Sequence, residues 1–232
     1  MPPAALIAFP WTFITRNANF LYKLGTSIGR LGVWLAGVKV EVRGYENLDP
    51  RCTYIFMCNH VSNLDPPILI PRVPARTSVL VKKELFRIPI LGPAMRLASL
   101  VPVDRRNREA AIASVQAGVA VLKTGIDMTV FPEGTRSPDG KLLPFKKGPF
   151  YLATDSGIPI VPVTVTGTEK LMPKGAAIIR PGKAILTFHP PIDPQRFETK
   201  EALIDAVRAA ISSALPKELH DQTTINGLTA DC

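Results

Sequence analysis

The 232-residue chain carries 28 Lys and Arg against 19 Asp and Glu, a formal net charge of +9, and 46% of its residues are hydrophobic. This length and composition are typical of one globular domain with a sizeable core, and they argue against two domains. The excess positive charge favours anionic partners such as phosphates, an acidic carrier protein or a membrane surface. Nucleic acid is not an expected partner, because aromatic residues are few and no groove-reading or zinc motif occurs.

The three cysteines, Cys52, Cys58 and Cys232, form neither a metal-ligand spacing nor an even-numbered disulfide framework, which fits a reducing compartment. No run of 18 apolar residues is free of charge, so a membrane-spanning helix is not expected. At the N-terminus the charges follow the apolar residues, the reverse of a secretory signal. The sequence therefore predicts a peripheral or monotopic protein at the cytoplasmic face of the cell membrane, with no bound metal.

Residues 1–37 are predicted to form an amphipathic, membrane-associating segment. Arg16, Lys23 and Arg30 recur every seven residues from Thr12 to Gly37, so on a helix they lie on one face, which we call the basic stripe. A broad apolar face lies away from it, formed by Leu21, Leu24, Ile28, Leu31 and Leu35. This pattern is typical of an interfacial membrane helix. The alternative is a helix that packs on the protein's own core with the basic stripe in water.

Residues 38–217 alternate between expected strands and helices, and residues 218–232 are expected to be a tail. Val38, Val40 and Val42 alternate with charged residues and predict a half-buried first strand. Further strands are expected at 54–58, 78–81, 101–103, 128–131, 158–165 and 183–188, and clear helices at 107–124, 149–156 and 199–215. Pro102 places its short strand at an edge or end of the sheet. The order predicts a single-domain α/β sandwich whose largely parallel central sheet is flanked by helices.

The stretch Asn59–Asp65 lies between the strand at 54–58 and Pro66, where a helix is expected to begin. Asp65 is then the natural N-cap, because proline is well tolerated at the first helical position, and His60 lies in the preceding turn. From this turn the carboxylate can hold one ring nitrogen of His60 and leave the other free to accept a proton. Alternatively, Asp65 only caps the helix and His60 only satisfies a turn carbonyl.

A second stretch, Phe131–Ser137, reads FPEGTRS and follows another apolar run. Together with the NHxxxxD pattern of Asn59–Asp65, it resembles the glycerolipid acyltransferase family, the lysophosphatidic acid acyltransferases. Two weaker family motifs fit the Asp104-Arg105 pair and the apolar, proline-containing strand at 158–163. The order and spacing fit the family from residue 54 to residue 166. Ser99 and Leu100 stand where the family pattern leads us to expect a glycine.

The resemblance implies an O-acyltransferase. It would move a fatty acyl group from an acyl thioester, either acyl-CoA or acyl-carrier protein, to the sn-2 hydroxyl of 1-acyl-glycerol-3-phosphate. The product would be phosphatidic acid, an intermediate of phospholipid biosynthesis. The acyl thioester is a co-substrate, and no cofactor is expected. The expected partners are lysophosphatidic acid, the acyl donor and an anionic membrane surface.

The resemblance also implies roles for individual residues. His60 would be the general base and Asp65 would orient it. The residues matched to substrate binding are Arg105, Glu133, Gly134, Thr135 and Arg136. Of these, the two arginines would hold the acceptor phosphate, because a guanidinium pairs with phosphate in a two-pronged geometry. Glu133 would accept a hydrogen bond from a glycerol hydroxyl, and Gly134 would allow close backbone approach.

Three other functions are open at this point. The chain could acylate a different lysophospholipid. It could be a hydrolase that uses Cys58 or Ser62 as nucleophile with His60 as base, although these residues lie awkwardly close in sequence and the EGTR stretch would then have no role. It could also be a non-catalytic lipid-binding module, which would need no paired His and Asp. Labelled acyl-CoA and lysophosphatidic acid would separate transfer, hydrolysis and neither.

Overall fold

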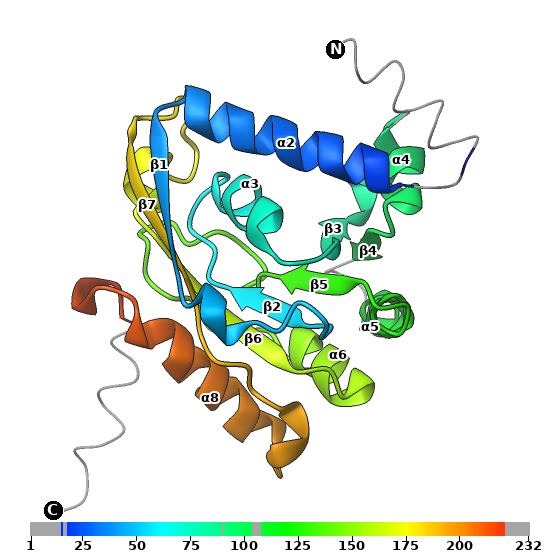
Figure 1. Ribbon diagram of the computed structural model, residues 1–232. Helices are drawn as coiled ribbons and strands as arrows, with labels where there is room; N and C mark the ends of the chain where they lie inside the picture. The colour runs from blue at the N-terminus through cyan, green and yellow to red at the C-terminus, as the bar shows by residue number, and fades with distance from the viewer. Residues whose placement is uncertain (1–14, 16–17, 90, 104–107, 221–232) are drawn as a thin grey trace, which may run out of the picture.

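The structure is a computed structural model that describes residues 15, 18–89, 91–103 and 108–220 (Figure 1). Several sequence predictions fall outside the described residues. They concern Arg16 of the basic stripe, most of the N-terminal segment before residue 18, the Asp104-Arg105 pair, and the tail from residue 221.

The described residues alternate between strands and helices, as predicted. The strands are β1 (Val38–Arg43), β2 (Ile55–Cys58), β3 (Thr77–Lys82), β4 (Val101–Val103), β5 (Asp127–Val130), β6 (Ile160–Thr166) and β7 (Gly182–Phe188). The α-helices are α2 (Asn19–Leu35), α3 (Asp65–Leu69), α4 (Leu91–Leu97), α5 (Arg108–Leu122), α6 (Gly148–Ser156), α7 (Thr168–Leu171) and α8 (Lys200–Ser213). Short 3-10 turns are η1 (Tyr45–Asn47), η2 (Ile70–Arg72), η3 (Lys83–Arg87), η4 (Pro194–Arg196) and η5 (Lys217–Leu219).

The strands form a sheet with the order β1-β7-β6-β2-β5-β3-β4. Neighbouring strands are parallel, except that β7 runs antiparallel to β6. The predicted α/β fold with a mostly parallel sheet is therefore confirmed. The short strand β4 lies at one edge, where Pro102 removes no hydrogen bond from a central ladder, as expected.

Helices cover both faces of the sheet (Figure 1). Along the central strand β2, Ile55 and Met57 pack in a core cluster with residues of α5, α6 and α8, whereas Phe56 and Cys58 pack on the opposite side with Leu69 of α3. All four side chains of β2 are fully buried. Burial on both faces explains why this strand is an uninterrupted apolar run and not an alternating one.

Helix α2 lies over α3 on one side of the sheet (Figure 1). It packs on the domain through Val33, which is buried in a cluster with Val38 of β1 and Ile68 of α3. Gly29 of α2 faces Pro67 of α3, where a Cβ would lie at an ordinary contact distance of 3.6 Å. Within the part of the chain that the structure describes, no helix combines the length and apolar character needed to cross a bilayer.

The position where the family pattern led us to expect a glycine has a glycine-like backbone. Ser99 has a φ of 62°, and among the described residues it is the one non-glycine residue with a positive φ. The side chain makes this left-handed conformation unfavourable for residues other than glycine. Here the Ser99 carbonyl accepts a hydrogen bond from the Ser78 hydroxyl, and its own hydroxyl accepts one from Arg76. These contacts hold the turn that leads into β4.

Candidate active site

The two sequence motifs meet at the carboxyl end of the central strands of the sheet. His60 follows β2 and Glu133 follows β5, and these strands are parallel neighbours, so their carboxyl ends lie side by side. The His60 N–H donates to Glu133 Oε1 at 2.7 Å, and the Ser137 N–H donates to the His60 carbonyl at 2.8 Å. Residues 73 positions apart in sequence therefore form a single site.

Asp65 lies fully buried beneath the turn. Its Oδ2 accepts hydrogen bonds from His60 Nδ1 at 2.8 Å and from the N–H groups of Val61 and Ser62 at 2.8 and 2.7 Å. Its Oδ1 accepts from the Thr168 hydroxyl at 2.7 Å. The predicted N-cap role is wrong, because α3 begins at Asp65 itself and the N-cap position is Leu64. The carboxylate instead organises the turn that carries His60.

The His60 ring is held on two sides. Because the Asp65 carboxylate only accepts, His60 Nδ1 carries the hydrogen in this contact. The ring also stacks on Phe131, with centroids 4.1 Å apart and an angle of 26° between the planes. The side chain is 17% exposed, and its Nε2 has no hydrogen-bond partner among the described residues. Nε2 can therefore accept a proton from a bound molecule, which is the geometry of a general base.

Glu133 is buried and anchors the two loops of the site. Its two carboxylate oxygens accept hydrogen bonds from the N–H groups of His60 and Leu143, at 2.7 and 3.0 Å. Burial raises the pKa of Glu133 to about 7, although these backbone bonds act to lower it. The predicted contact with a glycerol hydroxyl stays a prediction. The observed contacts give the side chain a positioning role, since it fixes the backbone of His60.

Replacing Glu133 by Gln tests this positioning role. The amide nitrogen of Gln cannot accept a hydrogen bond, so one of the two buried N–H groups loses its partner, which typically costs about 1–3 kcal/mol. We expect kcat to fall, while KM for the acceptor changes by less than about twofold, because no substrate contact is removed. A large rise in the acceptor KM at unchanged kcat would instead show that Glu133 contacts the substrate.

The same variant has a pH signature. The pKa of Glu133 is higher in the folded protein than the usual 4.5, so the folded state binds more protons and stability falls as pH rises through about 7. The amide side chain of the variant cannot ionise. Thermal unfolding at pH 5 and pH 8 should therefore show a smaller pH-dependent loss of stability for Glu133→Gln than for the wild type. The difference is at most about 3 kcal/mol, because one pKa unit corresponds to about 1.4 kcal/mol.

The remaining predicted binding residues lie on the loop after β5. Gly134 has a φ of 71°, which suits glycine, and its N–H donates to the Phe131 carbonyl to close the turn. Thr135 is exposed. The Arg136 carbonyl accepts a hydrogen bond from Lys174 Nζ at 2.8 Å. Arg136 is half-buried, and its guanidinium forms no ion pair with another described residue. The structure thus places Arg136 on the loop beside His60, whereas Arg105 lies outside the described residues.

The structure does not support Cys58 or Ser62 as a nucleophile. Both are fully buried. Burial raises the pKa of the Cys58 thiol well above its usual value, and its sulfur contacts the Asn59 side chain. The Ser62 hydroxyl donates to the Met172 carbonyl at 2.7 Å. Neither group is hydrogen-bonded to His60, so neither is activated by it.

Two contributors to the site were not predicted from the sequence. Phe131 was recognised as part of a motif but not as the surface on which His60 stacks. Thr168, which donates to Asp65, lies in α7 after β6, 103 residues further along the chain. No local pattern signals such a contact. Asn59 also joins distant segments. Its side-chain NH₂ donates to the Val165 carbonyl and its Oδ1 accepts from the Val165 N–H, which connects the end of β2 to β6.

A family model described as Acyltransferase matches residues 39–166, more than half of the chain. The chain belongs to this acyltransferase family. The 1-acyl-sn-glycerol-3-phosphate acyltransferase of Limnanthes alba is 39% identical over 189 residues, which cover 81% of this chain and 66% of that protein, just under two thirds of its length. The enzyme of the same name from Borreliella burgdorferi is 33% identical over 80% of this chain and 75% of its own length.

A solved structure shares the whole fold of this acyltransferase. The crystal structure of the 1-acyl-sn-glycerophosphate acyltransferase PlsC from Thermotoga maritima matches with a TM-score of 0.77 and 30% sequence identity. The match covers 99% of this chain and 90% of that one. The family membership expected from the two sequence motifs is therefore confirmed.

Proposed function

We propose that this protein transfers an acyl group from an acyl thioester to the 2-hydroxyl of 1-acylglycerol 3-phosphate, which gives phosphatidic acid. The observation that carries the proposal is the hydrogen bond between His60 Nδ1 and the buried Asp65, which leaves Nε2 available at the site. The names of the relatives from Limnanthes and Borreliella support the same acceptor.

The chemistry follows from this pair. His60 Nε2 takes the proton of the acceptor hydroxyl as its oxygen attacks the thioester carbonyl carbon, and Asp65 stabilises the imidazolium that forms. The tetrahedral intermediate then collapses, the carbon–sulfur bond breaks, and the leaving thiolate receives the proton. The products are an oxygen ester and a free thiol. A thiolate leaves readily, so a single base that returns its proton is sufficient.

A panel of acceptors tests the proposed substrate. Purified protein is incubated with a labelled long-chain acyl-CoA and either lysophosphatidic acid, another lysophospholipid or no acceptor. We expect labelled phosphatidic acid as the main product and little free fatty acid. Preferential labelling of a different lysophospholipid would assign the alternative acceptor. Release of free fatty acid in every arm would instead indicate a thioester hydrolase, and no consumption of the donor would fit a non-catalytic lipid-binding module.

Arg136 is proposed to bind the acceptor phosphate, because its guanidinium lies on the loop beside His60 without an internal ion pair among the described residues. We expect Arg136→Ala to raise KM for lysophosphatidic acid about ten- to a hundredfold, the effect of a lost charge-assisted hydrogen bond. Arg136→Lys should restore only part of the affinity, since an ammonium does not reproduce the two-pronged contact. Initial rates at varied acceptor and donor concentrations measure both effects.

Arg51→Ala is the matched control, because Arg51 is exposed and precedes β2, at the end of the strands opposite to His60. Its kinetics should be those of the wild type. An equal rise of donor and acceptor KM in Arg136→Ala would contradict the proposed role and point to a general disturbance of the site.

We further propose that α2 holds the protein on an anionic membrane surface. While Val33 packs inward, five large apolar side chains on α2 are exposed, namely Phe20, Ile28, Leu31, Trp34 and Leu35. Such an apolar face on a helix with basic residues is typical of membrane interfaces. It also suits the acceptor, because extracting a lipid into water costs about 0.8 kcal/mol for each CH₂ group. The cytoplasmic location stays a prediction from the sequence.

Reversing the basic stripe tests this proposal. We expect the combined change of Arg16, Lys23 and Arg30 to Glu to reduce sedimentation with anionic vesicles, with little effect on transfer measured in detergent. High salt should also weaken wild-type binding, but less completely than the charge reversal does, because salt does not screen apolar burial. A control that changes Lys123, Arg196 and Lys217 to Glu has the same net charge. If the stripe variant sediments like the wild type, or no worse than this control, α2 is a packing helix and not a membrane contact.

A further inference from the structure

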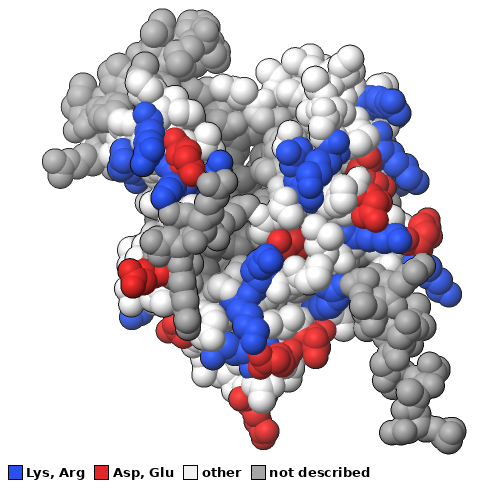
Figure 2. All heavy atoms as spheres, turned by 180° about the vertical axis from the view of Figure 1, so that it is seen from behind, with Lys and Arg blue, Asp and Glu red and all other residues white. Residues whose placement is uncertain are grey.

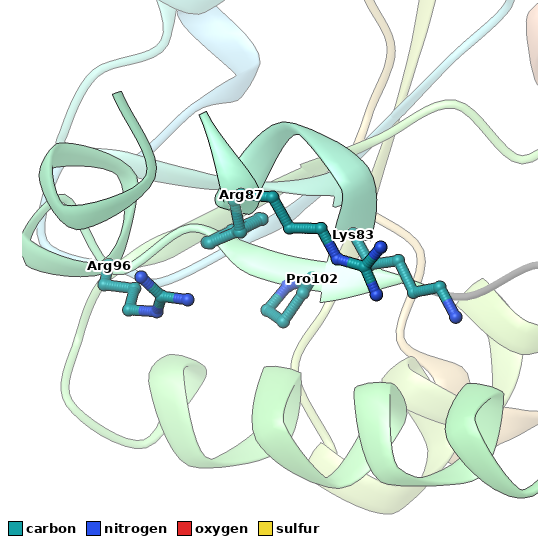
Figure 3. Close-up of a pocket in the computed structure, with 5 residues that line it drawn as sticks. Lys83, Arg87, Arg96 and Pro102 are labelled. Atoms are coloured by element: carbon teal, nitrogen blue, oxygen red, sulfur yellow. The ribbon is translucent and has the colours of Figure 1, made fainter. Parts of the chain in front are cut away.

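A basic pocket of about 470 Å³ lies at the β4 side of the sheet and has no part in the chemistry described above. Its lining residues are Lys83, Phe86, Arg87, Arg96 and Pro102, three of which are cationic. Figure 3 shows Arg96 reaching from α4 toward Pro102, while Arg87 extends past Pro102 toward Lys83. The cations thus surround one concave surface, which is the arrangement expected for an anionic ligand of small-molecule size.

The pocket is held together by close packing of α4 on η3. Phe86 of η3 is buried, and the Arg96 guanidinium lies over its ring at 5.7 Å from the centroid. A Cβ on Gly92 would come within 2.1 Å of the Phe86 carbonyl oxygen, so only glycine allows α4 to lie this close. The N–H of Gly92 also donates to the Ile88 carbonyl at 2.9 Å. The basic side chains are therefore carried by a packed backbone.

The pocket lies beside the edge strand β4, and its Lys83 comes from the same carboxyl end of the strands as His60. Lys83 follows the carboxyl end of β3, Pro102 lies in β4, and both strands run parallel to β2 and β5. From β2, the order of the sheet passes through β5 and β3 to β4. Three strand spacings of about 4.8 Å separate β2 from β4, which is about 14 Å across the sheet.

We propose that this pocket binds the phosphates of a coenzyme A donor, an inference that rests on the proposed acyl transfer. In such a donor, a pantetheine arm of about 13 bonds joins the thioester sulfur to the first phosphorus, comparable with slightly more than four residues of extended chain, or about 15 Å. This reach is comparable with the separation of β2 and β4 across the sheet. The thioester can then lie at His60 while Lys83, Arg87 and Arg96 hold the phosphates.

The same comparison of lengths excludes the acceptor phosphate from this pocket. In 1-acylglycerol 3-phosphate, about four bonds separate the reacting oxygen from phosphorus, a distance of about 5 Å. The acceptor phosphate therefore lies near His60, within the reach of Arg136, whose loop follows the adjacent strand β5.

A carrier protein fits the observations less well than a small donor. Docking of an acidic carrier requires a broad basic surface, whereas the three cations of the pocket line one concavity. Among the described residues of the face drawn in Figure 2, acidic side chains lie beside the Lys and Arg side chains. The cations of the pocket instead converge on a concavity with an aromatic residue in its wall. This geometry favours a nucleotide with several phosphates.

Equilibrium binding of free coenzyme A tests the inference without requiring turnover. Titration calorimetry compares the wild type with Arg87→Ala, Arg96→Ala and a control, Arg196→Ala, whose exposed side chain lies in η4 and pairs with Asp193. We expect each pocket variant to raise Kd about tenfold and the control to leave it unchanged. Adenosine 3′,5′-bisphosphate should bind the wild type and compete with coenzyme A. Thermal unfolding of each variant verifies that it is folded.

Steady-state kinetics provide the second readout. The donor KM should rise in both pocket variants, while the acceptor KM stays at the wild-type value. Wild-type affinity for coenzyme A in folded Arg87→Ala and Arg96→Ala overturns the inference, and so does a rise confined to the acceptor KM or to a carrier-protein donor. Arginine-dependent binding of coenzyme A by a wild type that performs no transfer would support the pocket assignment while rejecting the proposed function.

Discussion

Replacing His60 by Ala is expected to lower the rate of acyl transfer by about 10²–10⁴-fold, the usual contribution of a general base. The fold should persist. The ring contributes its bond to Asp65 and its stack on Phe131, whereas the backbone N–H and carbonyl of His60, which join the two loops, are unaffected by the change. The rate of thiol release at saturating donor and acceptor measures the loss.

His220→Ala is the matched histidine control. His220 lies near the end of the described chain, where its ring contacts the Leu215 carbonyl and no residue of the site. We expect normal thiol release in this variant. Near-normal turnover by folded His60→Ala would remove the proposed mechanism, because no other described group within the site has a free basic nitrogen next to a carboxylate.

Asp65→Asn should have the second largest effect, with a loss of about ten- to a hundredfold from removal of a charge-assisted bond. The sequence alone suggests that an amide would favour the wrong tautomer of His60. The structure indicates a different cause. Three donors converge on Oδ2, from His60, Val61 and Ser62, so the oxygen of Asn is expected to occupy this position. Its NH₂ group then faces the Thr168 hydroxyl, which can rotate to accept.

The orientation of His60 is therefore retained in Asp65→Asn, and what is lost is the negative charge that stabilises the imidazolium. We expect this variant to remain more active than His60→Ala. Asp65→Ala leaves the buried N–H groups of Val61 and Ser62 without partners, so it should lose stability as well as activity. Thiol release and thermal unfolding of the two variants provide the measurements. Activity in Asp65→Asn at or below the level of His60→Ala would contradict this account.

Much of the fold could be predicted because its signals are local. The apolar run at Ile55–Cys58 correctly indicated a buried strand, and the proline in β4 an edge strand. Thr199 caps α8 by accepting the Ala202 N–H, and Gly157 ends α6 with a φ of 69°, both as the residue types suggest. Parallel pairing then brings the ends of β2 and β5 together, so the meeting of His60 and Glu133 follows from topology.

The details of the site could not be predicted in the same way. Whether the Glu133 carboxylate faces substrate or backbone depends on the position of Leu143, in a loop whose path no local pattern determines. The N-cap prediction for Asp65 used a sound preference, but tertiary donors, including Thr168, outweighed it. The alternatives for the N-terminal helix were also not exclusive, because α2 packs on the domain with Val33 and still exposes a second apolar face.

The position of the label in the product tests the central claim most directly, that His60 activates the 2-hydroxyl of the acceptor. Wild type and His60→Ala are incubated with a labelled acyl-CoA and 1-acylglycerol 3-phosphate, and the labelled chain is located by fragmentation mass spectrometry. The account predicts phosphatidic acid with the label at the sn-2 carbon in the wild type, and about 10²–10⁴-fold less of it in the variant. Labelled free fatty acid as the main wild-type product, or equal sn-2 labelling by folded His60→Ala, would contradict it.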